Sequence, residues 1–318
     1  MDILARLANL PGALPGACAQ GLIWGIMAIG VYLTYRILDV ADLTVDGSLG
    51  TGGAVCVVMV LNGVPVGLAL LAATAAGMLA GLVTGLFHTA CGIPAILAGI
   101  LTQLALYSVN LRIMGFGTGG GKANLPISVD KYSLLVSARY VRNVALNNPI
   151  LILVIFCAVL IAVLYWFFGT ELGCSLRATG ANQNMARAQG INTNVAKVLG
   201  LMISNGLVAL AGGLLAQYQG FSDINMGRGA IVIGLAAVII GEVIFSRIFR
   251  NFALKLLSAV IGAIIYYIVM VFVLRLGLST DDLKLLTALV VALFLTIPYW
   301  KGKYFTKTSV KKGEKNHA

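Results

Sequence analysis

The chain alternates between long apolar runs and short polar interruptions. Apolar runs of about 20 residues can cross the hydrocarbon core of a bilayer as helices. The pattern predicts eight uninterrupted spans, at residues 17–35, 66–87, 93–114, 149–168, 198–218, 231–245, 256–274 and 285–299. Residues 39–61 form a further segment that is apolar only in its second part. We therefore predict an all-α polytopic membrane helical bundle of about 8–10 transmembrane segments, some broken or re-entrant, in a single domain over residues 1–318.

The first part of residues 39–61 is too polar for an ordinary helix at membrane depth. Residues 39–53 hold three carboxylates, four glycines and three hydroxyl side chains. Such backbone is tolerated inside a membrane where it is packed in protein or lines a watery cavity. Broken helices of this kind also mark the substrate region of many transporters. The pattern favours a re-entrant or split segment, with an ordinary loop as the alternative.

A second stretch repeats these features in the same order. Residues 219–229 contain Asp223 and a glycine-rich turn, and they lead into an apolar run. Two such segments in corresponding halves of a chain indicate a possible internal repeat, a recurrent design among transporters.

Polar side chains inside apolar spans are costly and usually face the bundle interior or a water-filled cavity. The residues that we expect to line a translocation pathway are Asp42, Asp46, Ser48, Asn110, Ser204, Asn205, Asp223 and Glu242. We expect Gln103 and Ser108 to face the bundle interior together with Asn110. For Glu242 the alternative is a structural ion pair with Arg247 or Arg250 at the membrane surface.

The most polar interruption in the middle of the chain is residues 169–197. A short helix there would place on one face the residues at i, i+4 and i+7, which are Ala181, Met185 and Ala188. Gly180 and Gly190 bracket this helix as a break and as the residue after its C-cap. Because so short a helix is unstable alone in water, we expect a partner to hold it, with a solvated connector as the alternative.

Several residues of this interruption resemble a known motif. Leu172-Gly173, Arg177-Ala178, Gly180, Asn182 and Gly190-Ile191-Asn192 resemble the cytoplasmic coupling loop of permease subunits of ABC importers for branched-chain amino acids and simple sugars. Asp42-Leu-Thr-Val-Asp-Gly-Ser48 resembles the Asp-Leu-Ser-Val-Gly-Ser signature of the sugar-type branch of that family. Cys174 is a departure, because relatives often carry a basic residue there. By overall pattern the likeness spans most of the chain.

The resemblance implies a permease subunit of an ATP-driven importer for an amino acid or a sugar. It implies as partners two cytoplasmic ATPase subunits that bind the ATP, an extracytoplasmic solute-binding protein and a second permease copy, as a homodimer. In the family the short helix sits in a cleft of the ATPase subunit. The residues that would make this ATPase coupling are Gly180, Ala181, Asn182, Met185, Arg187, Ala188 and Gly190.

Composition and charge agree with a cell-membrane protein. The chain is 59% hydrophobic and 10% charged, whereas about a quarter of the residues of a soluble domain are charged. The formal net charge of +11 would suggest nucleic acid in a soluble protein, but here the basic residues lie in loops and in the tail, residues 300–318. Three Lys and Arg in residues 169–197, three in 247–255 and six in the tail predict that these segments are cytoplasmic, so the C-terminus is too.

The count of crossings raises a question about the N-terminus. Nine full crossings would place it outside, whereas relatives in the family have both ends inside. We therefore expect residues 39–61 to be re-entrant or split.

No reaction chemistry stands out in the sequence. The five cysteines are scattered without metal-ligand spacing, and no paired His, Asp or Glu motif occurs, so we expect neither an enzyme nor a metal site. Residues 115–122 imitate a phosphate-binding loop, but Phe116 stands where glycine is required and Ala123 where Ser or Thr is required. The alternative function is an ion-coupled secondary transporter that uses Glu242 and the aspartates of residues 39–53, without an ATPase.

Overall fold

A computed structural model describes most of the chain. The described residues are 10–117, 119–128, 131–132, 134–141, 148–245, 248–249, 251–275, 285, 287–289, 291–293 and 296. The predicted span 285–299 therefore lies largely outside the described residues, and the basic tail lies wholly outside them.

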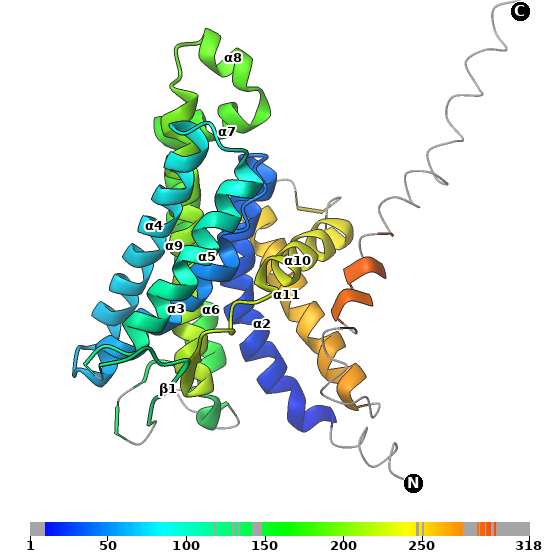
Figure 1. Ribbon diagram of the computed structural model, residues 1–318. Coiled ribbons are helices and arrows are strands. Elements are labelled where there is room, and N and C mark those ends of the chain that lie inside the picture. Colours follow the sequence, from blue (N-terminus) through cyan, green and yellow to red (C-terminus); the bar gives the residue numbers. More distant parts are fainter. Residues whose placement is uncertain are drawn as a thin grey trace, which may run out of the picture.

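The described chain is a bundle of helices (Figure 1). In chain order the elements are α2 (Leu10–Tyr32), the π-helical turn η1 (Leu33–Ile37), α3 (Val45–Leu61), α4 (Val66–Thr89), α5 (Ala95–Met114), β1 (Asn124–Pro126), the 3-10 turn η2 (Ala138–Tyr140), α6 (Pro149–Phe168), α7 (Glu171–Ala181), α8 (Gln183–Ala188), α9 (Thr193–Gln219), β2 (Phe221–Asp223), α10 (Ala230–Phe245) and α11 (Phe252–Arg275). Six helical stretches within the described residues are long and apolar enough to cross a membrane, and α3 and α10 are shorter apolar helices. The predicted polytopic helical bundle is confirmed.

The helices divide into a central and a peripheral set. The span that contains α2 is 83% buried and α9 is 72% buried, so these two helices form the centre of the bundle. α6 has the highest mean hydropathy, 3.1, and only 17% of it is buried, as expected for a helix that faces lipid. The centre is held by small residues: a Cβ at Gly52 would collide with the carbonyl oxygen of Ala209 in α9, and backbones this close exclude larger side chains.

α3 and α10 are the short helices that follow the two irregular segments. With 17 and 16 residues they are about 25 Å long, less than the roughly 30 Å of the hydrocarbon core. Each begins inside the bundle, after residues 38–44 and 220–229 respectively (Figure 1). The first segment departs from regular backbone at Asp39, a non-glycine residue with φ of 55°. Residues 39–61 are therefore split, as predicted.

The two halves of the chain run in opposite directions. α2 rises from the end that holds β1 to the end that holds α7 and α8, and α9 descends alongside it (Figure 1). A long helix, an irregular segment, a short helix and another long helix follow in both halves. This order fits an inverted repeat of the kind expected from the sequence.

The end of the bundle at which α2 begins bears on the family-based expectation for the N-terminus. The split segment 38–61 still crosses the bundle, because its irregular part descends from the α7 end and α3 completes the passage (Figure 1). The start of α2, the first described element, consequently lies at the end opposite to α8 (Figure 1). The expectation assumed that a split segment would remove one crossing. Residues 39–61 are split and still cross the bundle, so no crossing is removed.

Candidate functional site: the buried polar network and the α7–α8 segment

Four of the predicted pathway residues are joined in or beside one buried network between residues 38–48 and α9. Asn205 donates from Nδ2 to Asp42 Oδ2 at 2.7 Å and accepts at Oδ1 from the Ser48 hydroxyl at 2.6 Å. The other carboxyl oxygen of Asp42 accepts from the backbone N–H of Thr44 at 2.9 Å. The hydroxyl of the preceding residue, Ser204, donates to the carbonyl oxygen of Gly30 in α2 at 2.7 Å. These bonds fasten the irregular segment and α2 to the central helix.

A chain of hydroxyl groups extends the network to two more helices. Thr44 Oγ1 and Thr84 Oγ1 are 2.7 Å apart, and the Thr84 hydroxyl lies 2.9 Å from Thr102 Oγ1. Thr84 belongs to α4 and Thr102 to α5, so the segment before α3 is bound to three long helices. None of these three threonines was among the predicted site residues.

The side chains of this network, and that of Asn110 nearby, are almost fully buried in the described chain. Asp42 and Asn110 are 2% exposed, and Ser48, Ser204 and Asn205 are 0% exposed. Asn110 donates to the carbonyl oxygen of Gly47 at 3.4 Å, while its own buried Oδ1 has no partner among the described residues. In this conformation the five side chains are enclosed between helices of one chain and line no open passage. Their lining role stays a prediction.

Asp46 links the two short helices. Its carboxyl oxygens accept from the backbone N–H groups of Gly229 and Ile231, both at 2.9 Å. A carboxylate at this position accepts from N–H groups that the start of a helix leaves without partners. It also interacts favourably with the positive end of the helix dipole. The first turn of α3 thereby caps α10, which joins the two halves of the chain inside the bundle.

The two remaining predicted pathway residues lie apart from the network. Asp223, in β2, accepts from the backbone N–H of Asn225 at 2.7 Å and lies 3.3 Å from Asn124 Nδ2, at the end of the bundle that holds the β1–β2 ladder. Glu242, near the end of α10, forms an ion pair with Arg36 Nε at 2.9 Å. The partners considered from the sequence, Arg247 and Arg250, lie outside the described residues.

α5 differs from the expectation that its polar residues face inward. Asn110 is buried, but Ser108 is exposed and Gln103 is only partly buried. Tyr107 is 43% exposed beside them. The buried positions of α5 repeat every four residues at Ala98, Thr102, Leu106 and Asn110, so Ser108 falls on the outer face of the single chain. The prediction for Ser108 was wrong.

The segment after α6 forms two helices instead of one. Thr170 begins α7 by accepting from the backbone N–H of Gly173, and Asn182 begins α8 by accepting from those of Asn184 and Met185. The break therefore falls at extended Asn182, and Gly180 lies inside α7, contrary to the bracket predicted from glycine alone. Gly190 has φ of 81° and follows the C-cap of α8, as predicted.

The predicted docking face is exposed. Ala181 is the last residue of α7, so it does not share a helix with Met185 and Ala188, but all three are exposed and Met185 is 64% so. Arg187 donates from Nε to Thr193 Oγ1 at 2.9 Å, which ties α8 to the start of α9. Gly180 has another use: a Cβ there would collide with the carbonyl oxygen of Ile37, so this glycine lets α7 press against η1.

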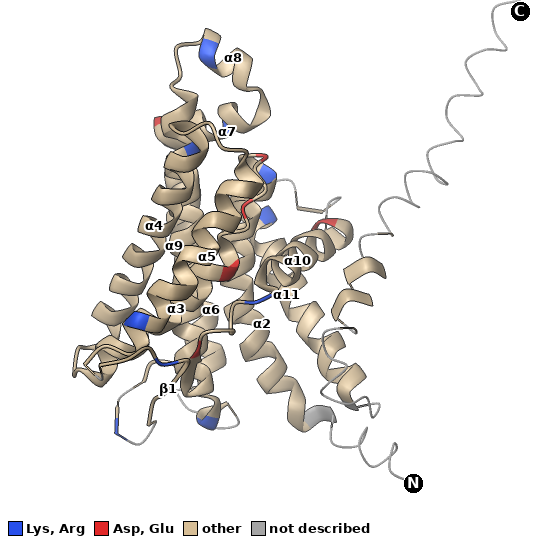
Figure 2. Cartoon of the chain, in the orientation of Figure 1, with Lys and Arg blue, Asp and Glu red and all other residues tan. Residues whose placement is uncertain are grey.

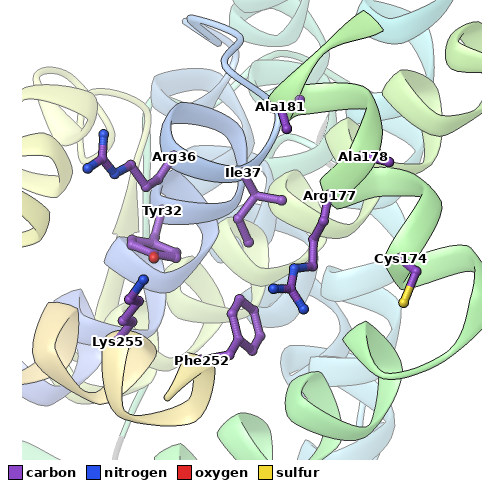
Figure 3. Close-up of a pocket in the computed structure, with 10 residues that line it drawn as sticks. Tyr32, Arg36, Ile37, Cys174, Arg177, Ala178, Ala181, Phe252 and Lys255 are labelled. Carbon is purple, nitrogen blue, oxygen red and sulfur yellow. The ribbon is translucent and has the colours of Figure 1, made fainter. Parts of the chain in front are cut away.

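A cavity of about 590 Å³ lies beneath α7. Its walls come from α2, η1, α7 and α11, and three cations, Arg36, Arg177 and Lys255, lie around it (Figure 3). The Arg177 guanidinium carbon lies 5.6 Å from the centre of the Phe252 ring. Among the described residues, neither Arg177 nor Lys255 has a carboxylate within ion-pair distance. The underside of α7 is therefore a basic surface.

Within the described residues, no group of three or more His, Cys, Asp or Glu side chains is arranged to hold a metal ion.

The chain is similar to known permeases over most of its length. The family described as the permease component of the branched-chain amino acid transport system matches residues 14–297. The tyrosine transport system permease protein of Clostridioides difficile (strain R20291) is 41% identical over 276 residues, which are 87% of this chain and 88% of that protein. The uncharacterized protein RP368 of Rickettsia prowazekii (strain Madrid E) is 36% identical over 284 residues, 88% of this chain and 95% of that protein.

A more distant relative and a solved structure agree with this. The autoinducer 2 import system permease protein LsrC of Salmonella paratyphi B is 28% identical over 219 residues, 69% of this chain and 59% of that protein. A chain of PsaBC from Streptococcus pneumoniae, solved in complex with Fab, has the same fold, with a TM-score of 0.51 at 16% identity over 92% of this chain and 94% of that chain. The chain therefore belongs to the family of permease components of branched-chain amino acid transport systems, the membrane-spanning permease subunits of ABC importers.

Proposed function

We propose that this permease imports an aromatic amino acid of the tyrosine class, driven by ATP that cytoplasmic partner subunits bind and hydrolyse. The observation that carries the substrate class is the 41% identity to a tyrosine transport system permease, which extends over 87% of this chain. The 28% identity to an autoinducer 2 permease is lower and covers 69% of the chain, so a sugar-like solute is the less supported choice.

The α7–α8 segment is the proposed docking site for the ATPase. α8 projects from one end of the bundle (Figure 1), and it is too short to be stable without a partner. The exposed Met185 and the small Ala181 and Ala188 offer an apolar face, and the basic cavity beneath α7 complements an acidic partner surface.

The proposed orientation places α8 in the cytoplasm of a multi-pass cell-membrane protein. The described cations lie at both ends of the bundle and do not decide the orientation by themselves (Figure 2). The support comes from the basic residues of segments 247–255 and 300–318, and from the likeness of residues 172–192 to a cytoplasmic coupling loop. On this orientation the C-terminus is also cytoplasmic.

A second copy and a solute-binding protein complete the proposed importer. α5 carries exposed Tyr107 and Ser108 on a span that is 28% buried, with a mean hydropathy of 1.4. Most of the other exposed side chains of α5 are Ile or Leu, so Tyr107 and Ser108 are polar groups on an otherwise apolar face that a second copy can cover. We therefore place the pathway at a homodimer interface and assign solute capture to an extracytoplasmic binding protein.

The test is uptake by the complete importer in liposomes. The permease is reconstituted with its ATPase and binding-protein partners, and uptake of labelled tyrosine, leucine and ribose is compared with and without ATP inside the vesicles. Tyrosine uptake that requires ATP is expected to exceed uptake of the other two solutes. Uptake of ribose alone would overturn the substrate class, and uptake driven by an ion gradient without ATP would support a secondary transporter.

The contacts of the carboxylates do not favour the secondary transporter. Asp42 and Asp46 already accept two or more hydrogen bonds each, and Glu242 is paired with Arg36. Carboxylates that bind and release a coupling ion need accessible oxygens, whereas these three hold the fold together.

A further inference from the structure

Arg228 is a charged residue at an unusual depth. It lies in the segment 220–229 just before α10, between Gly227 and Gly229, and both glycines touch Asp46. Gly227 lies against the carbonyl oxygen of Asp46, and the backbone N–H of Gly229 donates to the Asp46 carboxyl at 2.9 Å. The backbone of Arg228 is therefore fixed beside the first turn of α3.

The first turn of α3 lies level with the middle of α5. A Cβ at Gly47, the residue after Asp46, would lie 3.2 Å from the Cα of Gln103 and 2.9 Å from Leu106 Cδ1. Gln103 and Leu106 are in the middle of α5, a 20-residue span. Figure 1 likewise shows α10 beginning well inside the bundle. Arg228 is consequently held near the centre of the bilayer.

The side chain of Arg228 is exposed on the single chain. Among the described residues it has no carboxylate within ion-pair distance. A guanidinium always carries its charge, and a bare charge at the bilayer centre is strongly disfavoured against lipid. At this depth an exposed Arg without an ion-pair partner among the described residues needs water or an anion from outside the chain, which points to a polar cavity on this side.

We propose that Arg228 receives the α-carboxylate of the transported amino acid in the translocation pathway. The start of α10, the other positive group nearby, is already capped by Asp46 and is not free for an anion. A guanidinium can bind a carboxylate through two parallel hydrogen bonds, a geometry that a neutral sugar lacks. Arg228 thus selects for a small carboxylate-bearing solute. This inference rests on the proposed function, since it deepens the choice of an amino acid over a sugar.

The water-accessibility test uses a single cysteine. In a chain whose five native cysteines are replaced by serine or alanine, Arg228→Cys is treated with a negatively charged, membrane-impermeant thiosulfonate. Its matched control is Val159→Cys, at the middle of lipid-facing α6, where Val159 is 57% exposed on the single chain. The Arg228→Cys thiol is expected to react at least about 10-fold faster. Equal rates at the two positions would overturn a water-facing Arg228.

The transport test uses the complete reconstituted importer at saturating binding protein. Arg228→Gln is expected to lower the maximal tyrosine uptake by about 10- to 100-fold, the range for one charge-assisted interaction, while binding-protein-stimulated ATP hydrolysis continues. Arg228→Lys keeps a cation and is expected to keep a larger share of the uptake.

Each outcome of this test decides the proposal. Wild-type uptake from Arg228→Gln would overturn it. Loss of uptake together with loss of dimer assembly would also overturn it, because Arg228 would then pair with the second copy. If the wild-type importer moves ribose and no amino acid, the proposed function itself fails, and this failure is seen before any variant is made.

Discussion

Asn205 is the residue whose removal should do most damage to the buried network. In the substitution Asn205→Ala, Asp42 Oδ2 loses its donor at 2.7 Å and Ser48 loses its acceptor at 2.6 Å. The side chain also donates to the carbonyl oxygen of Leu201 at 3.0 Å. All of this takes place at a site with 0% exposure, where water cannot replace the lost partners without opening the helices.

The size of the effect follows from these contacts. A buried hydrogen bond contributes about 1 kcal/mol, and leaving its buried partners unsatisfied costs about 1 kcal/mol more, so losing all three lowers the free energy of unfolding by about 4 kcal/mol. For a protein of this size each kcal/mol shifts the melting temperature by roughly 2 °C or more, so we expect a drop of about 8 °C in detergent. Asn62→Ala is the matched control, because exposed Asn62 makes a single bond to its own helix; it should shift the melting temperature by about 1 °C.

A double-mutant cycle measures the interaction between Ser48 and Asn205. Ser48→Ala alone removes one donor and is expected to lower the free energy of unfolding by about 1 kcal/mol. In the Asn205→Ala background the same change should have almost no further effect, because its partner is already gone. If the two effects add fully, or if Asn205→Ala melts within about 2 °C of the Asn62→Ala control, then the network does not hold the segment to α9.

Three further predictions concern the short helices and the docking segment. Gly180→Ala places a Cβ against the carbonyl oxygen of Ile37 and should lower the free energy of unfolding by about 1–3 kcal/mol in thermal melts. Gly67→Ala, with open space around it, should not destabilise the protein. Equal melting temperatures of the two variants would contradict the close approach of α7 and η1. Asp46→Ala removes the cap of α10 and should speed amide hydrogen exchange over the first turn of α10 by about 10-fold, which corresponds to about 1 kcal/mol or slightly more. Asp46→Asn should give an exchange rate between those of wild type and Asp46→Ala. Unchanged exchange would mean that the carboxyl does not cap α10. Met185→Asp alters an exposed side chain, so its melting temperature should stay within about 1 °C of wild type while ATP-driven uptake falls at least about 10-fold; retained uptake would remove Met185 from the docking face.

The spans were predictable because apolar length is a local property of the chain. α6 begins and ends at the predicted residues, Pro149 and Phe168. α9 begins at Thr193, five residues before the predicted start, because Asn192 caps it and the polar first turn carries no apolar signal. The charge of Lys197 predicts that it belongs to the polar loop before the helix. In the structure Lys197 lies within α9 and is only 9% exposed.

The break within the docking segment was predictable only in part. Glycine predicts a break at Gly180, whereas the chain breaks at Asn182, whose side chain caps α8. Asparagine is among the best N-cap residues, so the signal was present in the sequence. Gly180 is needed for the close approach of η1, a tertiary contact that no local pattern contains.

The partners of the polar residues could not be predicted from the sequence. Asp42 and Asn205 are 163 positions apart, and only the antiparallel packing of the two halves brings them together. The local pattern indicates that both are unusual at membrane depth, and it predicts a pathway role for both. A buried polar group can be satisfied by protein as well as by water, and the spacing of residues along one helix does not distinguish these two cases.

The contacts of η1 connect the proposed docking segment to the network. α7 touches η1 where Gly180 meets Ile37, and the side chains of Leu38 and Leu176 lie against Gly200 of α9. A few residues later the same segment is bound through Asp42 to Asn205, also on α9. A displacement of α7 would therefore reach α9 by two routes, one apolar and one polar, which the same irregular segment carries. The buried hydrogen bond between Asp42 and Asn205 is short and resists stretching. Residues 38–44 would therefore move with α9 as one body. On the proposed docking, this explains why polar side chains that line no open passage in this conformation lie at membrane depth: they keep the irregular segment from absorbing the motion.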